Sequence, residues 1–97
     1  MKYECHITIE PVSGDRLTVF DVLAKAYGFR VAKLLMVKPR VSTPERSNKD
    51  SFCTGHSDDY DDIHSKMFLL AEDLRNSGYK VWRTKIEEIL YDCRTTA

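Results

Sequence analysis

Hydrophobic positions follow two periods along this chain, a period of two that is typical of half-buried strands and a period of about 3.6 that is typical of helices. Residues 3–10 carry apolar side chains on one parity and polar side chains on the other, and Pro11 ends this run. A helical period then extends from about Asp15 to Tyr27, and Gly28 supplies a left-handed stop. The pattern therefore begins with a strand and an amphipathic helix.

The middle of the chain predicts two more strands with a loop between them. Strand-forming residues fill positions 29–37. Two prolines and several small polar residues follow over about 39–50, which indicates a long loop, and loops of this length are often functional or mobile. Residues 51–56 then predict a short strand that has Phe52, Thr54 and His56 on one face.

A second amphipathic helix and a last strand complete the pattern. Ser57 or Asp58 can cap this helix, the neighbouring aspartates favour its positive end, and Gly78 stops it. Residues 79–88 alternate as a strand does. We expect the apolar stripes of the two helices to pack on the sheet, with Leu17, Phe20, Leu23, Ile63, Met67, Leu70 and Leu74 against Cys5, Ile7, Ile9, Trp82 and Ile86.

The order strand, helix, strand, strand, helix, strand resembles the ferredoxin-like βαββαβ sandwich, which is an α+β fold. The resemblance implies a four-stranded antiparallel sheet with strand order 4-1-3-2 and with both helices on one face. A chain of 97 residues suffices for one such domain and is too short for two, so we assign residues 1–97 to a single domain.

Charge and cysteine content limit the kinds of binding partner and the cellular location that the sequence favours. Fifteen basic and fifteen acidic residues cancel, although basic residues gather between Arg30 and Lys49 and aspartates between Asp58 and Asp62. The odd number of cysteines and the lack of a signal-like or membrane-spanning apolar run favour a reduced, cytoplasmic protein that is not bound to a membrane. We expect no cofactor.

A zinc site is one interpretation of the cysteines and histidines. The atoms that zinc prefers are carried by Cys5, His6, Cys53 and His56. However, there is no C-x-x-C pair, and Cys5 and His6 are neighbours in a strand, where successive side chains point to opposite faces. We therefore expect the two cysteines to be buried and no metal to be bound.

Polar residues recur on one parity of three predicted strands. In the order 4-1-3-2 the first strand lies between the third and the fourth, so these residues converge on the helix-free face. We assign His6 and His56 as candidate catalytic residues, because two imidazoles across a gap can act as general base and general acid. The candidate ligand-binding residues are Thr8, Thr54, Arg83, Lys85, Glu87 and Lys33.

These residue types point to a phosphate. Hydroxyl groups can orient imidazoles or bind a phosphoryl oxygen, and the cations can neutralise its charge. We therefore expect a small phosphorylated or nucleotide ligand that the open face binds and, if the protein is an enzyme, hydrolyses without a metal.

The run His6-Ile7-Thr8-Ile9 is similar to the H-x-T-x element of the 2H phosphoesterases. That family cleaves or ligates 2′,3′-cyclic and related phosphodiesters with two such elements, so the resemblance implies a phosphodiesterase-like hydrolase. Here the second element is reversed, as Thr54-Gly55-His56, and the chain supplies one ferredoxin-like lobe where the family has two. Either the site is complete on one sheet, or two copies of the chain pair as a homodimer to form it.

Other interpretations remain open. Open faces of antiparallel sheets are often polar, so Arg83, Lys85 and Glu87 can also form a solvated ladder with acidic residues of the first strand. A non-enzymatic accessory module, regulatory or inhibitory, can bind a ligand or a protein through the same face. General RNA binding is less favoured, because Phe52 is the one aromatic residue that the first and third strands offer on that face.

Overall fold

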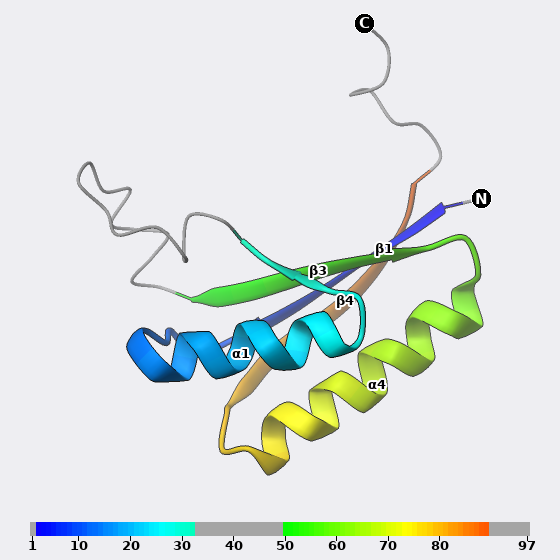
Figure 1. Ribbon diagram of the computed structural model, residues 1–97. Coiled ribbons are helices and arrows are strands. Elements are labelled where there is room, and N and C mark those ends of the chain that lie inside the picture. The colour runs from blue at the N-terminus through cyan, green and yellow to red at the C-terminus, as the bar shows by residue number, and fades with distance from the viewer. Residues whose placement is uncertain (1, 33–49, 90–97) are drawn as a thin grey trace, which may run out of the picture.

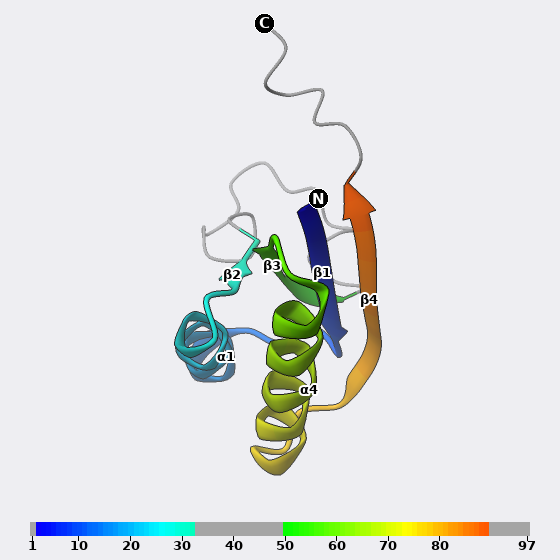
Figure 2. The ribbon, with the colours of Figure 1, turned by 90° about the vertical axis from the view of Figure 1, so that its right-hand side faces the viewer.

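The computed structural model describes residues 2–32 and 50–89, which form one antiparallel sheet of four strands and two helices (Figure 1). The sheet order is β2-β3-β1-β4, which is the predicted order read from the opposite edge. Both helices lie on the same side of the sheet (Figure 2). The α+β class is confirmed. The elements are β1 (Lys2–Ile9), α1 (Gly14–Ala26), β2 (Arg30–Val31), β3 (Ser51–Ser57), α4 (Tyr60–Asn76) and β4 (Val81–Ile89).

Both helices end where glycines were predicted to stop them. Gly28 and Gly78 have φ angles of 78° and 89°, in the left-handed region that favours glycine. The start of α4 differs from the prediction, because its N-cap is Asp59 rather than either of the two residues before it. Ser57 belongs to β3, and its hydroxyl donates to Asp62 and accepts from the backbone of Asp59. Neither α1 nor α4 is long and apolar enough to cross a bilayer.

The core forms between the helices and one face of the sheet, as the apolar pattern predicted. Burial raises the pKa of the Cys5 thiol to about 12 and raises the pKa of Cys53 as well, so both cysteines act as small apolar residues. Several residues at the margin, including Leu17, Met67 and Ile86, are partly buried against this core. Among residues 2–32 and 50–89, the apolar residues with no exposed surface are Cys5, Ile7, Ile9, Phe20, Ala24, Cys53, Ile63, Leu70 and Leu74.

Trp82 was predicted in the core, and this prediction is wrong, because 55% of the residue's surface is exposed. The pairing of β1 with β4 shifts between Thr8 and Ile9. Arg83 is opposite Thr8, whereas Val81 is opposite Ile9, so Trp82 is the extra residue of a bulge. Val81 therefore packs against the core in its place.

The second strand is described only in part. Of the strand predicted over 29–37, the structure describes β2 at Arg30–Val31. Lys33 and the remainder of that strand lie outside the described residues, and so does the predicted loop over about 39–50, except for its last residue.

Leu70 should contribute strongly to stability, because its side chain is fully buried. We expect Leu70→Ala to lower the free energy of unfolding by about 2 to 5 kcal/mol in chemical denaturation. Leu69 is a matched control, since it precedes Leu70 on α4 and is 51% exposed, and Leu69→Ala should change the free energy by about 0.5 kcal/mol or less. Equal effects of the two substitutions would show that the buried face of α4 is misassigned.

Gly55 should tolerate no larger residue, because a Cβ at this position would lie 2.7 Å from a ring carbon of the buried Phe29. We expect Gly55→Ala to destabilise the protein by about 1 to 3 kcal/mol, the usual range for overpacking. In a Phe29→Leu background the same substitution should destabilise less, since the smaller side chain leaves room. Thermal denaturation of the four proteins measures the difference, and an undiminished effect in that background would place the strain elsewhere.

Candidate functional site

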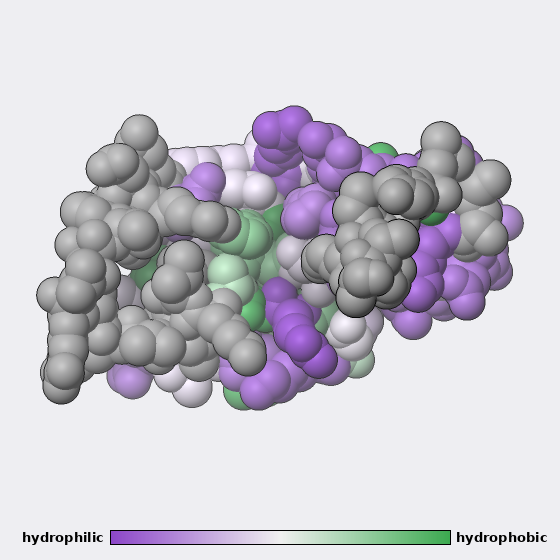
Figure 3. Space-filling view, turned by 90° about the horizontal axis from the view of Figure 1, so that it is seen from above, coloured by the Kyte–Doolittle hydropathy of each residue, from purple (hydrophilic) through white to green (hydrophobic). Residues whose placement is uncertain are grey.

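The strand register places the polar residues of the open face in rows across the sheet. Figure 3 looks onto this face and shows hydrophilic residues around a smaller apolar area. The middle row contains Arg30, Thr54, His6 and Lys85, in the order β2, β3, β1 and β4. The rows on either side contain Phe52, Thr8 and Arg83, and His56, Glu4 and Glu87. Side chains from four strands are therefore neighbours on one face.

His6 is held at both ring nitrogens. Thr54 Oγ1 lies 3.1 Å from Nδ1, and a carboxylate oxygen of Glu4 lies 3.2 Å from Nε2. Thr54 is directly across on β3, whereas Glu4 is two residues earlier on β1 and so shares the face of His6. Because an ionised carboxylate can only accept a hydrogen bond, Nε2 carries a proton in this contact. Two neighbours thus fix the orientation of the ring.

Glu4 joins the two histidines. Its second carboxylate oxygen lies 2.9 Å from Nε2 of His56, so one carboxylate accepts hydrogen bonds from both imidazoles. Partial burial raises the pKa of Glu4, but the hydrogen bonds from His56 and His6 and the charges of these rings outweigh burial, and the pKa lies below its usual value. Glu4 is therefore an ionised acceptor between the two rings at neutral pH.

A second carboxylate approaches His6 from β4. Oε1 of Glu87 lies 3.8 Å from Nε2 of His6, and Oε2 lies 3.6 Å from Nζ of Lys85. Glu87 is also directly opposite Glu4 in the register, where like charges destabilise a sheet. The imidazole of His6 therefore lies next to two carboxylates that belong to different strands.

Beside His6 the face is hollowed into a pocket of about 200 Å³, which we call the open-face pocket. It combines two cations, a hydroxyl group, an imidazole, a carboxylate and an aromatic ring from three strands. Among the described residues, the guanidinium of Arg83 makes no ion pair, so its charge is available to an anion. The residues that line the pocket are His6, Thr8, Phe52, Arg83, Lys85 and Glu87.

A second hollow of about 340 Å³ is lined by Gly28, Arg30, Thr54 and His56. The structure thus places the two predicted catalytic histidines at different hollows. They are connected through the carboxylate of Glu4, which contacts both rings.

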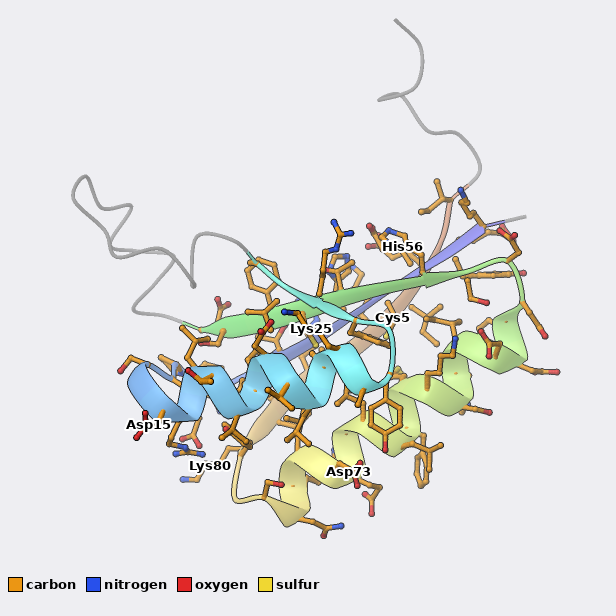
Figure 4. The ribbon with its side chains drawn as sticks, in the orientation of Figure 1. Cys5, Asp15, Lys25, His56, Asp73 and Lys80 are labelled. Atoms are coloured by element: carbon orange, nitrogen blue, oxygen red, sulfur yellow. The ribbon has the colours of Figure 1, made fainter. Side chains whose placement is uncertain are left out.

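The four residues considered for zinc do not come together. Figure 4 shows His56 on the open side of the sheet and Cys5 on the helix side. Cys5 and Cys53 are fully buried in the core, while His6 and His56 belong to the other face. Lys33, which was predicted to bind the ligand, lies outside the described residues.

Three residues of the face were not predicted as site residues. Glu4 shares the parity of His6 and is opposite His56, so the predicted fold together with the exact pairing would have identified it. Phe52 shares the parity of Thr54, and its place in the pocket follows from its position opposite Thr8. Arg30 required the pairing of β2 with β3, which the sequence pattern does not specify.

No model of a known protein family matches the chain, and no curated protein matches it in sequence. Functional conclusions about this chain therefore depend on the site itself.

Proposed function

We propose that the protein binds a small phosphorylated ligand of the nucleotide class in the open-face pocket. The observation that carries this proposal is the convergence of Arg83, Lys85 and Thr8 in one pocket with an aromatic ring. The element order, the antiparallel sheet and the helices on one side agree with a ferredoxin-like sandwich, in which the helix-free face is left for a ligand. The chemistry of the pocket, and not the fold, indicates the kind of ligand.

Charge supports an anionic ligand. Arg83 and Lys85 occupy alternate positions of β4, and the planar fork of an arginine can bond two oxygens of a phosphoryl group. The hydroxyl of Thr8, directly opposite Arg83, can donate to another oxygen. Glu87 offsets the charge of Lys85 through their ion pair, which leaves Arg83 as the main anchor.

The size of the pocket supports a ligand with a phosphoryl group and a planar ring. Its volume of about 200 Å³ is below the range of about 300–1,000 Å³ for pockets that enclose a drug-sized ligand. The pocket can therefore hold the phosphoryl group while the remainder of the ligand lies along the sheet. Phe52, opposite Thr8, also lines this pocket, and stacking of a base on an aromatic ring is worth about 1–3 kcal/mol.

His6 supplies a group for a hydrolytic version of this function. In the hydrolysis of a cyclic phosphodiester, His6 would take a proton from water as the water oxygen bonds to phosphorus, and would return a proton to the leaving oxygen as the P–O bond breaks. The likeness of His6-Ile7-Thr8-Ile9 to the phosphoesterase element supports this version. His56 does not line this pocket, so it acts as a positioning residue through Glu4.

Binding without turnover is the second version, and a specific contact favours it. Nε2 of His6 is bonded to Glu4 and Nδ1 to Thr54, so His6 acts as a base only after one of these two hydrogen bonds breaks and frees a ring nitrogen without a proton. A non-enzymatic accessory module needs no such step. Turnover is therefore the measurement that separates the two versions.

Arg83 should dominate the affinity for phosphorylated ligands. A hydrogen bond to a charged group contributes about 1.5–3 kcal/mol, so we expect Arg83→Gln to raise Kd by about 10- to 100-fold. The measurement is an NMR titration with inorganic phosphate, a nucleoside monophosphate and a 2′,3′-cyclic nucleotide. Arg75→Gln is the matched control, because Arg75 pairs with Glu72 on α4, and it should leave Kd unchanged. Shifts that spare His6, Thr8 and Lys85 would place the ligand elsewhere.

If the protein hydrolyses 2′,3′-cyclic nucleotides, His6→Ala should lower kcat by about 10²- to 10⁴-fold, the usual contribution of a general acid or base. His56→Ala should lower kcat less, because His56 acts through Glu4. Product formation measured by chromatography should persist in the presence of a strong chelator. Binding of the panel without turnover would reject the enzyme and retain the binding module.

A further inference from the structure

Three potential metal ligands converge on the open face, on the side of His6 that Thr54 does not contact. A nitrogen of His6 and one carboxylate oxygen each from Glu4 and Glu87 all lie within 4.8 Å of one another. Nε2 of His6 lies 3.2 Å from Oε1 of Glu4 and 3.8 Å from Oε1 of Glu87. The group combines one imidazole with two carboxylates, which is a donor set that zinc accepts.

These separations suit a tetrahedral ion. With metal–ligand bonds of about 2.0–2.2 Å, two ligands at the corners of a tetrahedron are roughly 3.4 Å apart. The separations of 3.2 Å and 3.8 Å lie on either side of this value. The third separation, between the carboxylate oxygens of Glu4 and Glu87, is at most 4.8 Å, so an ion that binds all three atoms would draw these two carboxylates closer together.

The charge at this position also favours a cation. Glu4 and Glu87 are directly opposite on β1 and β4, an arrangement in which two carboxylates destabilise a sheet. Lys85 neutralises part of this charge from 3.6 Å, at Oε2 of Glu87, whereas His6 is nearer to Oε1. A divalent ion between the two carboxylates would replace their mutual repulsion with attraction to the ion.

Hydrogen bonds from neighbouring residues orient two of the three potential ligands. Residues outside the coordination sphere orient the ligands of known metal sites in the same way. Thr54 Oγ1 contacts Nδ1 of His6 at 3.1 Å, which fixes the ring with Nε2 toward the carboxylates. His56 contacts the second oxygen of Glu4 at 2.9 Å, so Oε1 remains directed at His6. The sequence pattern singled out Thr54 and His56, and in this arrangement both serve the ligands.

We propose that Glu4, His6 and Glu87 form a binding site for a divalent transition-metal ion of the zinc type, with Thr54 and His56 as positioning residues. The fourth position of the tetrahedron is left to water. The ion takes the lone pair of Nε2, so the proton on Nε2 leaves the ring for solvent or for Nδ1. The proton on Nδ1 is then donated to Thr54 Oγ1.

This site goes beyond the proposed function and does not depend on it. The phosphate anchors Arg83, Lys85 and Thr8 are not metal ligands, so phosphate binding can be tested in a chelator and metal binding can be tested without phosphate. A bound ion would also withdraw His6 from acid or base chemistry, because it occupies the nitrogen that would carry the proton.

Titration of the metal-free protein with Zn²⁺ and Co²⁺ alone tests the proposal. We expect one ion per chain by calorimetry, and a Co²⁺ absorption spectrum of tetrahedral intensity without a thiolate charge-transfer band. His6→Gln and Glu87→Gln should weaken binding by more than about 100-fold, and Thr54→Val by about 10- to 100-fold. His64→Gln is the matched control, since His64 is an exposed histidine of α4 stacked on Tyr60, and it should bind as the original protein does.

Amide NMR spectra establish that each variant is folded, and the Co²⁺ spectrum of the unchanged protein provides a test that needs no variant. Failure to bind either ion at millimolar concentration would overturn the proposal. A thiolate band would overturn it as well, and so would equal affinities of the His6→Gln and His64→Gln proteins. Weaker phosphate binding in Arg83→Gln with Zn²⁺ affinity retained would separate the two sites.

Discussion

The central strand β1 is the element on which the rest of the structure depends, because its two edges pair with β3 and β4 and its two faces lie in different environments. Cys5 and Ile7 are fully buried on one face, and His6 and Thr8 lie on the other. A slip of one residue would exchange the faces and bury a histidine without its partners, which is unfavourable. Burial of apolar side chains on the helix side therefore determines which polar groups meet on the open side.

On that open side, both histidines contact carboxylates. A pair of imidazoles suggests acid and base catalysis when it is considered alone. The register adds Glu4, which bonds to both rings, and Glu87, which approaches one of them. Each imidazole is thus part of a hydrogen-bonded network that includes at least one carboxylate.

Elements with a strong local signal and the order of the strands were predictable, whereas the residue-by-residue register between strands was not. The helices and β1 follow from the spacing of apolar residues, and Gly28 and Gly78 mark the helix ends. The parity rule failed at Trp82, because it assumes a regular strand and the bulge removes one residue from the pairing. The role of Glu4 was missed for a related reason, since its bond to His56 depends on how two distant segments align.

The glycine in Thr54-Gly55-His56 has a cause on the other side of the sheet. The ring of Phe29 occupies the space that a side chain at position 55 would need. The motif-like appearance of this segment therefore combines two separate constraints, one from each face of β3. In relatives of this chain, glycine at position 55 would vary together with the aromatic residue at position 29, and its presence would carry no information about whether the histidine beside it is retained.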